Sequence, residues 1–462
     1  MDDAASEVTV PIPSSGQDRA GDIEKNDKFS EGPDRPSDDP SESAKPAQGE
    51  APYFPDGGYA WVVCICGFWL SAVTWGINSA FGVFLSFYLD NDYFPGATPL
   101  QFAFVGGLSL SCAMAVGPVS NFITKRYGTR WTMAFGSLFL AGGQIAAGFV
   151  TKIWQLFLTQ GVMFAVGLGL IMVSNQPIVA QWFGKKRGLA SGIAGAGSGA
   201  GGLIYSNLTR YLLQKKGLRW AFLVNGLTSA AVMLPCTILM KSRAKPLKAR
   251  FEPFKVDLFR NSGFLSLVGW GLFSQLGYLV GLYSIPLFAT AGLGFSQTQG
   301  STLQSLLSAG QLLGRPLVGL FLDRVGRING SSIVSVSTGI ACLCIWMFSR
   351  TMPVLGLFAI LQGALSGIFW QACNTLLVEI IGIRDQTSGI SMLWLSIVPS
   401  ATVAEPIAIL LIDYSKDHLG RTGPRAFEIS IGFAGASFIV SGLALFGAKF
   451  YKQKSRKIWV KA

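Results

Sequence analysis

Charged residues and histidine are scarce in this chain of 462 residues. Only 13% of its residues are Asp, Glu, Lys or Arg, whereas an ordinary soluble domain carries roughly a quarter. Too little polar surface therefore remains to cover a single large soluble core. The one histidine, His418, excludes both a histidine-rich metal site and a catalytic pair of histidines.

Motifs for cofactors and catalysis are also missing. The seven cysteines form no C-x-x-C motif and all fall within apolar stretches, so they indicate buried packing residues rather than a disulfide framework. The sequence contains no Walker A motif, so ATP-driven chemistry is not supported. No combination of nucleophile and base, or cluster of metal ligands, indicates an enzyme. We therefore expect neither enzymatic activity nor a cofactor or metal.

The net charge of +12 is unevenly distributed along the chain. Residues 1–57 hold 14 of the 25 acidic residues and five basic residues, whereas residues 58–462 hold 32 basic and 11 acidic residues. The first segment is rich in Asp, Glu, Pro, Ser and Gly, which predicts a disordered acidic tail. The basic residues that follow flank apolar runs, so we expect a membrane topology signal and no nucleic-acid partner.

Long apolar runs fill the chain after residue 58. A helix that crosses the hydrocarbon core of a bilayer needs roughly 20 mostly apolar residues. Candidate runs are residues 59–88, 100–123, 131–150, 153–181, 188–211, 219–240, 263–290, 298–322, 329–349, 353–380, 388–412 and 426–449. They predict an all-α membrane protein with twelve transmembrane helices.

Lysine and arginine counts in the loops predict the orientation of these helices. The loops and tail on the side of the two termini hold 22 basic residues, and the loops on the opposite side hold nine. Because basic residues accumulate on the cytoplasmic side, both termini are predicted to be cytoplasmic. We expect a multi-pass protein of the plasma membrane.

Residues recur at half the length of the apolar region. Pro118 and Pro316 are 198 positions apart, as are Gly128 and Gly326, and Ser191 and Ser388 are 197 apart. A duplicated six-helix unit is typical of carriers with two halves around a central site. The predicted organisation is a disordered acidic cytoplasmic tail (1–57), an N-terminal half (58–240), a basic cytoplasmic linker (241–262), a C-terminal half (263–450) and a basic cytoplasmic tail (451–462).

Few ionisable residues lie within the predicted spans, where they are costly and usually functional. Arg315 lies midway along the eighth span, and its guanidinium is suited to binding a carboxylate. Two alternatives stay open: Arg315 contacts an anionic substrate, or it pairs permanently with Glu405 or caps backbone carbonyls. The polar residues favoured as further substrate contacts are Asn78, Gln311 and Asn374.

Two stretches resemble the signatures of known transporters. Residues 319–327, Gly-Leu-Phe-Leu-Asp-Arg-Val-Gly-Arg, resemble the G-x-x-x-D-[RK]-x-G-[RK] signature of the major facilitator superfamily. Residues 55–63, Pro-Asp-Gly-Gly-Tyr-Ala-Trp-Val-Val, resemble the first-span signature of its monocarboxylate porter family. The acidic N-terminal tail and the Gly-Gly-Tyr-Ala-Trp stretch are similar to the fungal branch. The resemblance covers residues 55–450 and implies the major facilitator fold.

The resemblance also implies roles for particular residues. In the family, the signature Asp and Arg residues are thought to latch the cytoplasmic helix ends in one carrier state, which here implies Asp323, Arg324 and Arg327. The repeat places Lys125 at the position equivalent to Asp323, so the latch is expected to be asymmetric or to be absent from the first half. The family's proton-coupling Asp and Lys are replaced by Gln311 and Ser79. Glu405 is then the candidate proton carrier.

Together, these patterns predict a secondary active transporter that moves a small, monocarboxylate-like organic acid by alternating access. Its partners would be the small-molecule substrate, a proton if transport is coupled, and the lipid bilayer. Uptake of a monocarboxylate and efflux of an acidic secondary metabolite both fit. A transporter-like membrane receptor is the alternative from a different class. The oligomeric state stays open.

Overall fold

The computed structural model describes residues 56–90, 93–97, 99–243, 255–382 and 385–453, which form helices and no β-strand. The N-terminal helices are α1 (Tyr59–Ser79), α2 (Phe81–Asp90), α3 (Pro99–Ala115), α4 (Gly117–Tyr127), α5 (Thr129–Ala147), α6 (Ile153–Leu156), η1 (Phe157–Met163), α7 (Phe164–Trp182), α8 (Arg187–Lys216) and α9 (Leu218–Leu239).

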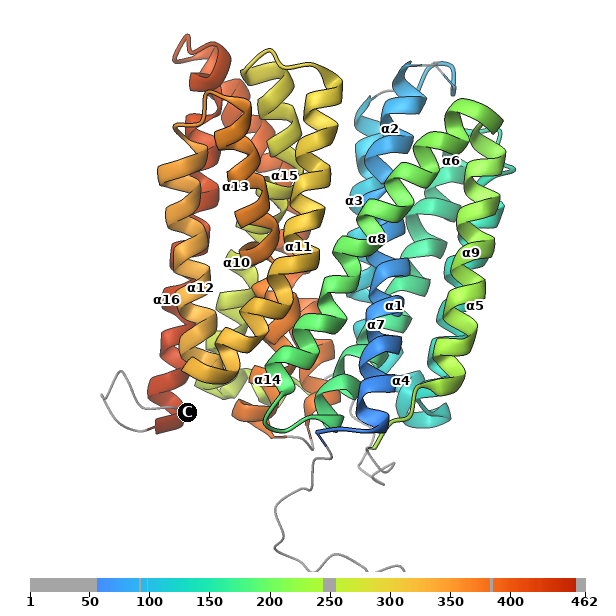
Figure 1. Cartoon of the computed structure of the whole chain (residues 1–462), viewed down its shortest axis with the longest axis vertical. Helices are drawn as coiled ribbons and strands as arrows, with labels where there is room; N and C mark the ends of the chain where they lie inside the picture. Colours follow the sequence, from blue (N-terminus) through green and yellow to red (C-terminus); the bar gives the residue numbers. More distant parts are fainter. Residues whose placement is uncertain (1–55, 91–92, 98, 244–254, 383–384, 454–462) are drawn as a thin grey trace, which may run out of the picture. The chain divides into compact units, whose positions relative to one another are not determined.

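The C-terminal helices follow in the same pattern of long and broken segments. They are η2 (Val256–Arg260), α10 (Ser262–Leu287), η3 (Phe288–Gly292), α11 (Gln297–Val325), α12 (Arg327–Ala341), η4 (Cys342–Trp346), α13 (Met352–Ser366), α14 (Ile368–Ile381), α15 (Gln386–Asp417), η5 (Gly423–Phe427) and α16 (Glu428–Gln453). Figure 1 shows α1–α9 on the right and α10–α16 on the left.

The expected all-α membrane fold is confirmed, and each predicted apolar run coincides with one helix or with consecutive helices. Among the described residues, nine such spans are long and apolar enough to cross a membrane. A tenth candidate is the pair α3–α4, bent by 44° between Ala115 and Gly117. Helices α5 and α8 are outside this set. In α8, the many Gly residues lower the mean hydropathy. The count of twelve spans therefore stays a prediction.

Two glycines end helices at equivalent places in the repeat. Gly128 follows α4 with a φ of 88°, and Gly326 follows α11 with a φ of 99°. A positive φ is strained for residues with a Cβ atom. Each glycine therefore lets one long helix stop and the next begin at once, α5 at Thr129 and α12 at Arg327. These two turns, between α4 and α5 and between α11 and α12, lie at the same end of the molecule (Figure 1), which we call the latch end.

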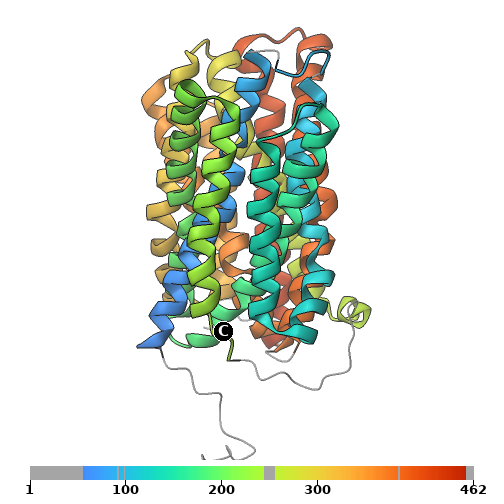
Figure 2. The same cartoon turned by 90° about the vertical axis from the view of Figure 1, so that its right-hand side faces the viewer.

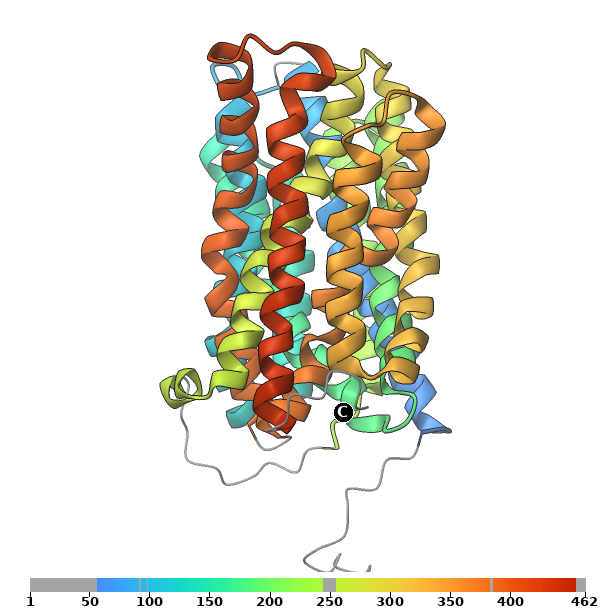
Figure 3. The same ribbon diagram turned by 90° about the vertical axis from the view of Figure 1, so that its left-hand side faces the viewer.

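Helix α8 packs between α1 and α11 and so joins the N-terminal and C-terminal helices. Figures 2 and 3 show the two outer sides of the molecule, with α5 and α9 on one side and α12 and α16 on the other. Helix α8 can approach both neighbours because its glycines have no side chain. A Cβ atom at Gly201 would overlap the Ala72 carbonyl of α1, and one at Gly199 would overlap the Ser308 carbonyl of α11. The Gly-rich run is therefore a helix-packing surface.

Parts of the predicted tails and linker lie outside the described residues. These parts are residues 1–55, 244–254 and 454–462. The predicted N-terminal tail reached residue 57, but Asp56 contacts the turn between α7 and α8. Helix α16 continues to Gln453, past the predicted boundary at 450. The described residues belong to one compact unit, Tyr53–Ala462, and its division into two halves stays a prediction.

Candidate functional site

A small cavity lies between the N-terminal and C-terminal helices near the middle of their length. Its volume is about 40 Å³, whereas ligand pockets usually measure roughly 300–1,000 Å³. The helices must therefore separate further to admit a substrate. The lining residues are Trp75, Asn78, Ser79, Leu110, Ser198, Gln275, Tyr278, Leu279, Leu282, Tyr283, Gln311, Arg315 and Trp370.

Arg315 extends from α11 towards α8 and is 4% exposed. Its Nη1 atom donates hydrogen bonds to the Gly195 carbonyl at 2.8 Å and to the Ser198 hydroxyl at 2.7 Å. Its Nε atom has no hydrogen-bond partner among the described residues. Tyr278 of α10 is a further polar neighbour. A buried cation with an unpartnered donor is a favourable place for a carboxylate to bind.

Arg315 either contacts a substrate, or pairs with Glu405 or caps backbone carbonyls. No ion pair joins Arg315 to Glu405 within the described part of the chain. Capping of a carbonyl does occur, at Gly195, but it uses only the Nη1 atom. The Nε and Nη2 atoms lie against Gly367, where an added Cβ atom would come within 2.9 Å of both, and the Arg315 side chain also lines the cavity. The arrangement is therefore compatible with substrate contact.

Two of the three predicted polar residues also line this cavity. Gln311 accepts a hydrogen bond from the Ser198 hydroxyl at 3.0 Å, and Asn78 donates to the Ser109 hydroxyl at 3.1 Å. Ser79, which stands where the family carries Lys, is a lining residue as well. Sequence reasoning missed Ser198 because a serine within a Gly-rich run carries no signal beyond close packing.

Asn374 lies elsewhere, between the cavity and the latch end. Its Nδ2 atom donates to Gln176 Oε1 at 2.9 Å, which joins α14 to α7. The two residues are 198 positions apart, the spacing of the repeat. They therefore form a contact between equivalent positions of the two predicted halves, and the geometry places Asn374 outside the cavity lining.

Glu405 is half-buried on α15 and stands outside the cavity lining. Its Oε2 atom is buried without a hydrogen-bond partner among the described residues. Tyr283, which lines the cavity, lies within electrostatic range of Glu405. The carboxyl group thus lies within electrostatic range of one cavity-lining residue, and it forms no ion pair within the described chain.

Aromatic side chains form part of the cavity wall. Trp75 of α1 and Trp370 of α14 have ring centroids 5.1 Å apart, so the pair joins N-terminal and C-terminal helices. Tyr278 and Tyr283 of α10 complete the aromatic surface. Two other aromatic residues near the middle of the bundle, Phe369 and Trp394, are fully buried in the core instead.

The latch end holds a second cluster, centred on Asp323 at the end of α11. The Asp323 carboxylate accepts hydrogen bonds from the Gly188 and Leu189 amides, each at 2.9 Å. These amides belong to the first turn of α8, where backbone N–H groups lack partners within the helix. A carboxylate is favourable there because it also meets the positive end of the helix dipole. Asp323 thus joins α11 to the start of α8.

Arg327 extends this cluster, and Arg324 does not. Arg327 forms an ion pair with Glu379 at 2.8 Å and donates to the Gly184 carbonyl at 2.9 Å. It also lies 3.8 Å from Asp323. Arg324 is exposed and makes no hydrogen bond or ion pair with the described residues. The structure thus brings Asp323 and Arg327 together with Glu379 and leaves Arg324 outside this cluster, and the latch role of all three predicted residues stays a prediction.

Asp56 binds the same turn, which sequence reasoning did not foresee. Its carboxylate accepts hydrogen bonds from the amides of Gly184 at 2.8 Å, Lys185 at 3.2 Å and Lys186 at 3.4 Å. Partial burial raises the pKa of Asp56, but these three amides and the charge of Lys186 lower it overall. The α7–α8 turn is thus bound by two carboxylates, those of Asp56 and Asp323.

The equivalent turn, between α14 and α15, is bound by two lysines. Lys125 of α4 donates to the Ser388 hydroxyl at 2.9 Å, and Lys255 pairs with Asp385 at 2.7 Å. Lys125 is the repeat equivalent of Asp323. The side chains that bind the two turns therefore carry opposite charges, carboxylates at one turn and lysines at the other.

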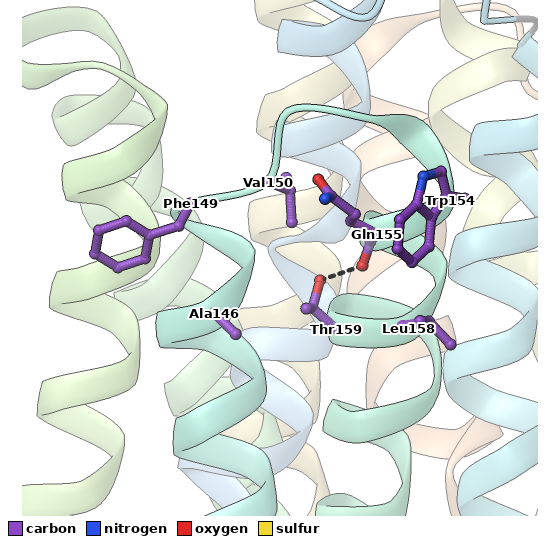
Figure 4. A pocket seen from close by; sticks show the side chains of 7 residues that line it. All are labelled: Ala146, Phe149, Val150, Trp154, Gln155, Leu158 and Thr159. Carbon is purple, nitrogen blue, oxygen red and sulfur yellow. Dashed lines mark hydrogen bonds between the residues drawn. The ribbon is translucent and has the colours of Figure 1, made fainter.

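A larger depression of about 260 Å³ lies on the surface away from Arg315. It is lined by Ala146, Phe149, Val150, Trp154, Gln155, Leu158 and Thr159 (Figure 4). The Gln155 side chain accepts hydrogen bonds from the Thr151 and Lys152 amides, so it caps the start of α6. The depression contains no charged side chain and offers no specific ligand contact. The described residues also contain no group of three or more metal-ligating side chains.

Comparisons with known proteins identify the family. The family model described as Major Facilitator Superfamily matches residues 63–290 and 271–461. A protein named "Probable transporter MCH2" from Saccharomyces cerevisiae is 32% identical over 82% of this chain and 80% of its own length. The agnestins efflux protein AgnL12 from Paecilomyces divaricatus is 29% identical over 82% of this chain and 86% of its own length.

Solved structures show the same fold. The E. coli fucose:proton symporter FucP matches with a TM-score of 0.64 and 14% identity over 86% of this chain and 100% of its own. The proton:xylose symporter XylE matches with a TM-score of 0.62 and 13% identity over 84% of this chain and 95% of its own. The relatives are transporters and not enzymes. This chain is a multi-pass membrane protein and a secondary transporter that belongs to the major facilitator superfamily.

Proposed function

We propose that this transporter moves a small, monocarboxylate-like organic acid by alternating access between two six-helix halves. The observation that carries the proposal is Arg315, a buried cation in the central cavity whose Nε atom has no partner among the described residues. A guanidinium can bind a carboxylate through two parallel hydrogen bonds. Gln311 and Asn78 would supply further polar contacts at the same place.

The first-span signature supports the monocarboxylate porter branch. Residues 55–63 carry that signature, and Asp56 within it holds the α7–α8 turn. Gln311 and Ser79, where the branch carries Asp and Lys, line the cavity beside Arg315. Substrate charge would therefore be balanced by Arg315 alone among the lining residues, because no other lining residue is ionised at neutral pH.

Contacts between the two groups of helices support a state closed at the latch end. Each side-chain hydrogen bond between α1–α9 and α10–α16 in the described chain involves the latch end or the middle of the helices. Among the residues that make these bonds, Ser198 is the one on α8 farthest from the latch end. On α3 the farthest is Ser111, whose hydroxyl oxygen lies 2.9 Å from that of Thr402. The positive-inside rule favours a cytoplasmic latch end in the plasma membrane. Substrate would then enter this state from the outside.

The test is transport by purified protein in proteoliposomes. Protein-dependent uptake is expected for small aromatic or aliphatic carboxylates and not for their methyl esters, because an ester lacks the charge that Arg315 would bind. An inward proton gradient is expected to accelerate uptake. Equal protein-dependent uptake of acids and esters, or no uptake of any carboxylate, would contradict the proposal.

Glu405 is proposed as the proton carrier, and its removal gives a separate prediction. Replacement by glutamine, Glu405→Gln, is expected to abolish accumulation driven by a pH gradient while exchange of substrate at equal pH continues. The reason is that the amide keeps the shape of the side chain but cannot release a proton. Glu428→Gln, at the start of α16 outside the cavity, is the matched control. Gradient-driven accumulation that persists in Glu405→Gln would exclude this role.

Efflux of an acidic secondary metabolite is the second candidate. It is favoured by one relative whose name describes an efflux protein for agnestins. Both candidates use the same Arg315 site, so the direction of transport distinguishes them. Export of a preloaded acid against its gradient would favour efflux.

A further inference from the structure

Gln275 is a polar residue of the cavity for which the fold shows no hydrogen-bonding role. It lies on α10 and is fully buried. Neither Nε2 nor Oε1 of its amide has a hydrogen-bond partner among the described residues. Buried amides in folded proteins almost always have partners, and an unpaired one costs roughly 1–3 kcal/mol. Its side chain lines the same cavity as Arg315.

The position of Gln275 relates it directly to Arg315. Residues 275, 278, 279, 282 and 283 of α10 all line the cavity, which is the spacing of one helical face. Gln275 is three residues before Tyr278, about 4.5 Å along the helix axis. Tyr278 in turn lies beside the Arg315 guanidinium. An unpaired amide therefore stands within reach of a small molecule whose carboxylate is bound at Arg315.

The aromatic cavity wall indicates which kind of group in a substrate would join a carboxylate bound at Arg315 to a polar group bound at Gln275. Trp75 and Trp370 approach each other from opposite groups of helices, and Tyr278 and Tyr283 line the α10 side. Aromatic surfaces favour flat apolar rings, which they contact by stacking or by edge-to-face packing. Once the helices have separated to admit a substrate, these walls would suit a planar ring bearing a carboxylate.

We propose that Gln275 is a specificity-determining residue that binds a second, uncharged polar group of the substrate. This inference rests on the proposed carboxylate site at Arg315. An amide side chain donates through Nε2 and accepts through Oε1, so its matching group must both accept and donate. A hydroxyl or a primary amide does so. The substrate class is thus a planar aromatic monocarboxylate carrying a hydroxyl or amide group.

The experiment compares benzoate with 3-hydroxybenzoate and 4-hydroxybenzoate. Binding to the purified full-length protein is measured from the shift in thermal unfolding, which reports the dissociation constant. At least one hydroxybenzoate is expected to bind about 10-fold more tightly than benzoate, because benzoate leaves the Gln275 amide unpaired. Gln275→Met keeps the length of the side chain and removes its amide. In this variant, benzoate and the hydroxybenzoates are expected to bind with about equal affinity.

Gln144→Met is the matched control, because Gln144 is an equally buried glutamine on α5 that does not line the cavity. It is expected to keep the preference of the wild type. If Gln275→Met does not purify as a folded protein, Gln275→Asn gives the same test with an amide on a shorter stem. That variant is also expected to lose most of the preference.

Different results would contradict the role of Gln275 and the carboxylate site at Arg315. Equal binding of benzoate and both hydroxybenzoates by the wild type, or an unchanged preference in Gln275→Met, would overturn the role of Gln275 alone. Binding of the acids no tighter than that of their methyl esters would overturn the Arg315 site, and the Gln275 inference with it. Carboxylate binding that is selective for the hydroxyl group and lost in Gln275→Met supports both.

Discussion

Replacing Arg315 with alanine is expected to lower carboxylate transport by about 100-fold or more. Truncating one partner of a buried, hydrogen-bonded charge pair costs roughly 2–5 kcal/mol, and each 1.4 kcal/mol is tenfold in affinity. The loss should be this large because Arg315 is the only cationic residue that lines the cavity in the described chain. Initial uptake rates in proteoliposomes, over a range of substrate concentrations, measure the effect.

Two further variants separate the charge of Arg315 from its role in packing. Arg315→Lys keeps the charge but loses the planar pair of donors, so an intermediate loss is expected. Ser198→Ala removes the hydroxyl that Nη1 contacts at 2.7 Å and leaves the guanidinium in place, so its effect should be small. Thermal unfolding of each purified variant shows whether the fold is intact. Wild-type transport of an anion by a folded Arg315→Ala protein would remove Arg315 from the site.

The helices were predictable because the bilayer imposes a simple length and composition rule. The predicted run 298–322 became α11, Gln297–Val325. Helix α8 was harder to predict, because its packing surface carries glycine at positions where most spans carry large apolar residues. The repeat was predictable since Gly128 and Gly326 both require a positive φ at equivalent turns.

The candidate site was predictable where charge marked it. Arg315 stood out because an arginine in the middle of an apolar span is costly unless it has a function. Gln275 did not stand out, because neutral polar residues in spans serve packing as often as binding. Asn374 shows the same difficulty, since it resembles a cavity residue in sequence and instead contacts Gln176.

The latch end was only partly predictable because its contacts are made to the backbone. Asp323 was identified from the signature, but its partners are the amides of Gly188 and Leu189, which side-chain identities do not reveal. Asp56 was assigned to the tail for the same reason. Arg187 precedes the predicted run 188–211, yet it is 5% exposed and donates to the Phe183 carbonyl.

Replacing Asp323 with alanine is expected to shift the equilibrium away from the closed latch by about 100-fold. Two hydrogen bonds to a charged group contribute roughly 1.5–3 kcal/mol each, so their loss totals about 3 kcal/mol or more. Transport should fall with it, because alternating access requires both end states to be populated. Hydrogen–deuterium exchange of the full-length protein measures opening, and proteoliposome uptake measures transport.

The location of the faster exchange decides what Asp323 does. Gly188 and Leu189 will exchange faster in Asp323→Ala simply because their amides lose an acceptor. The informative segments are α4 and the start of α15, where Gly117 lies against the backbone of Ser391 and Lys125 contacts Ser388.

These segments do not touch Asp323, so faster exchange there means that the whole latch end has opened. Arg324→Ala is the matched control from the same signature, and it should change neither segment because Arg324 is exposed and makes no hydrogen bond or ion pair with the described residues. Faster exchange confined to Gly188 and Leu189, together with unchanged transport, would reduce Asp323 to a helix cap. Since Lys125 rather than a carboxylate contacts Ser388 near the equivalent turn, the described residues show no second contact of the same kind that would compensate.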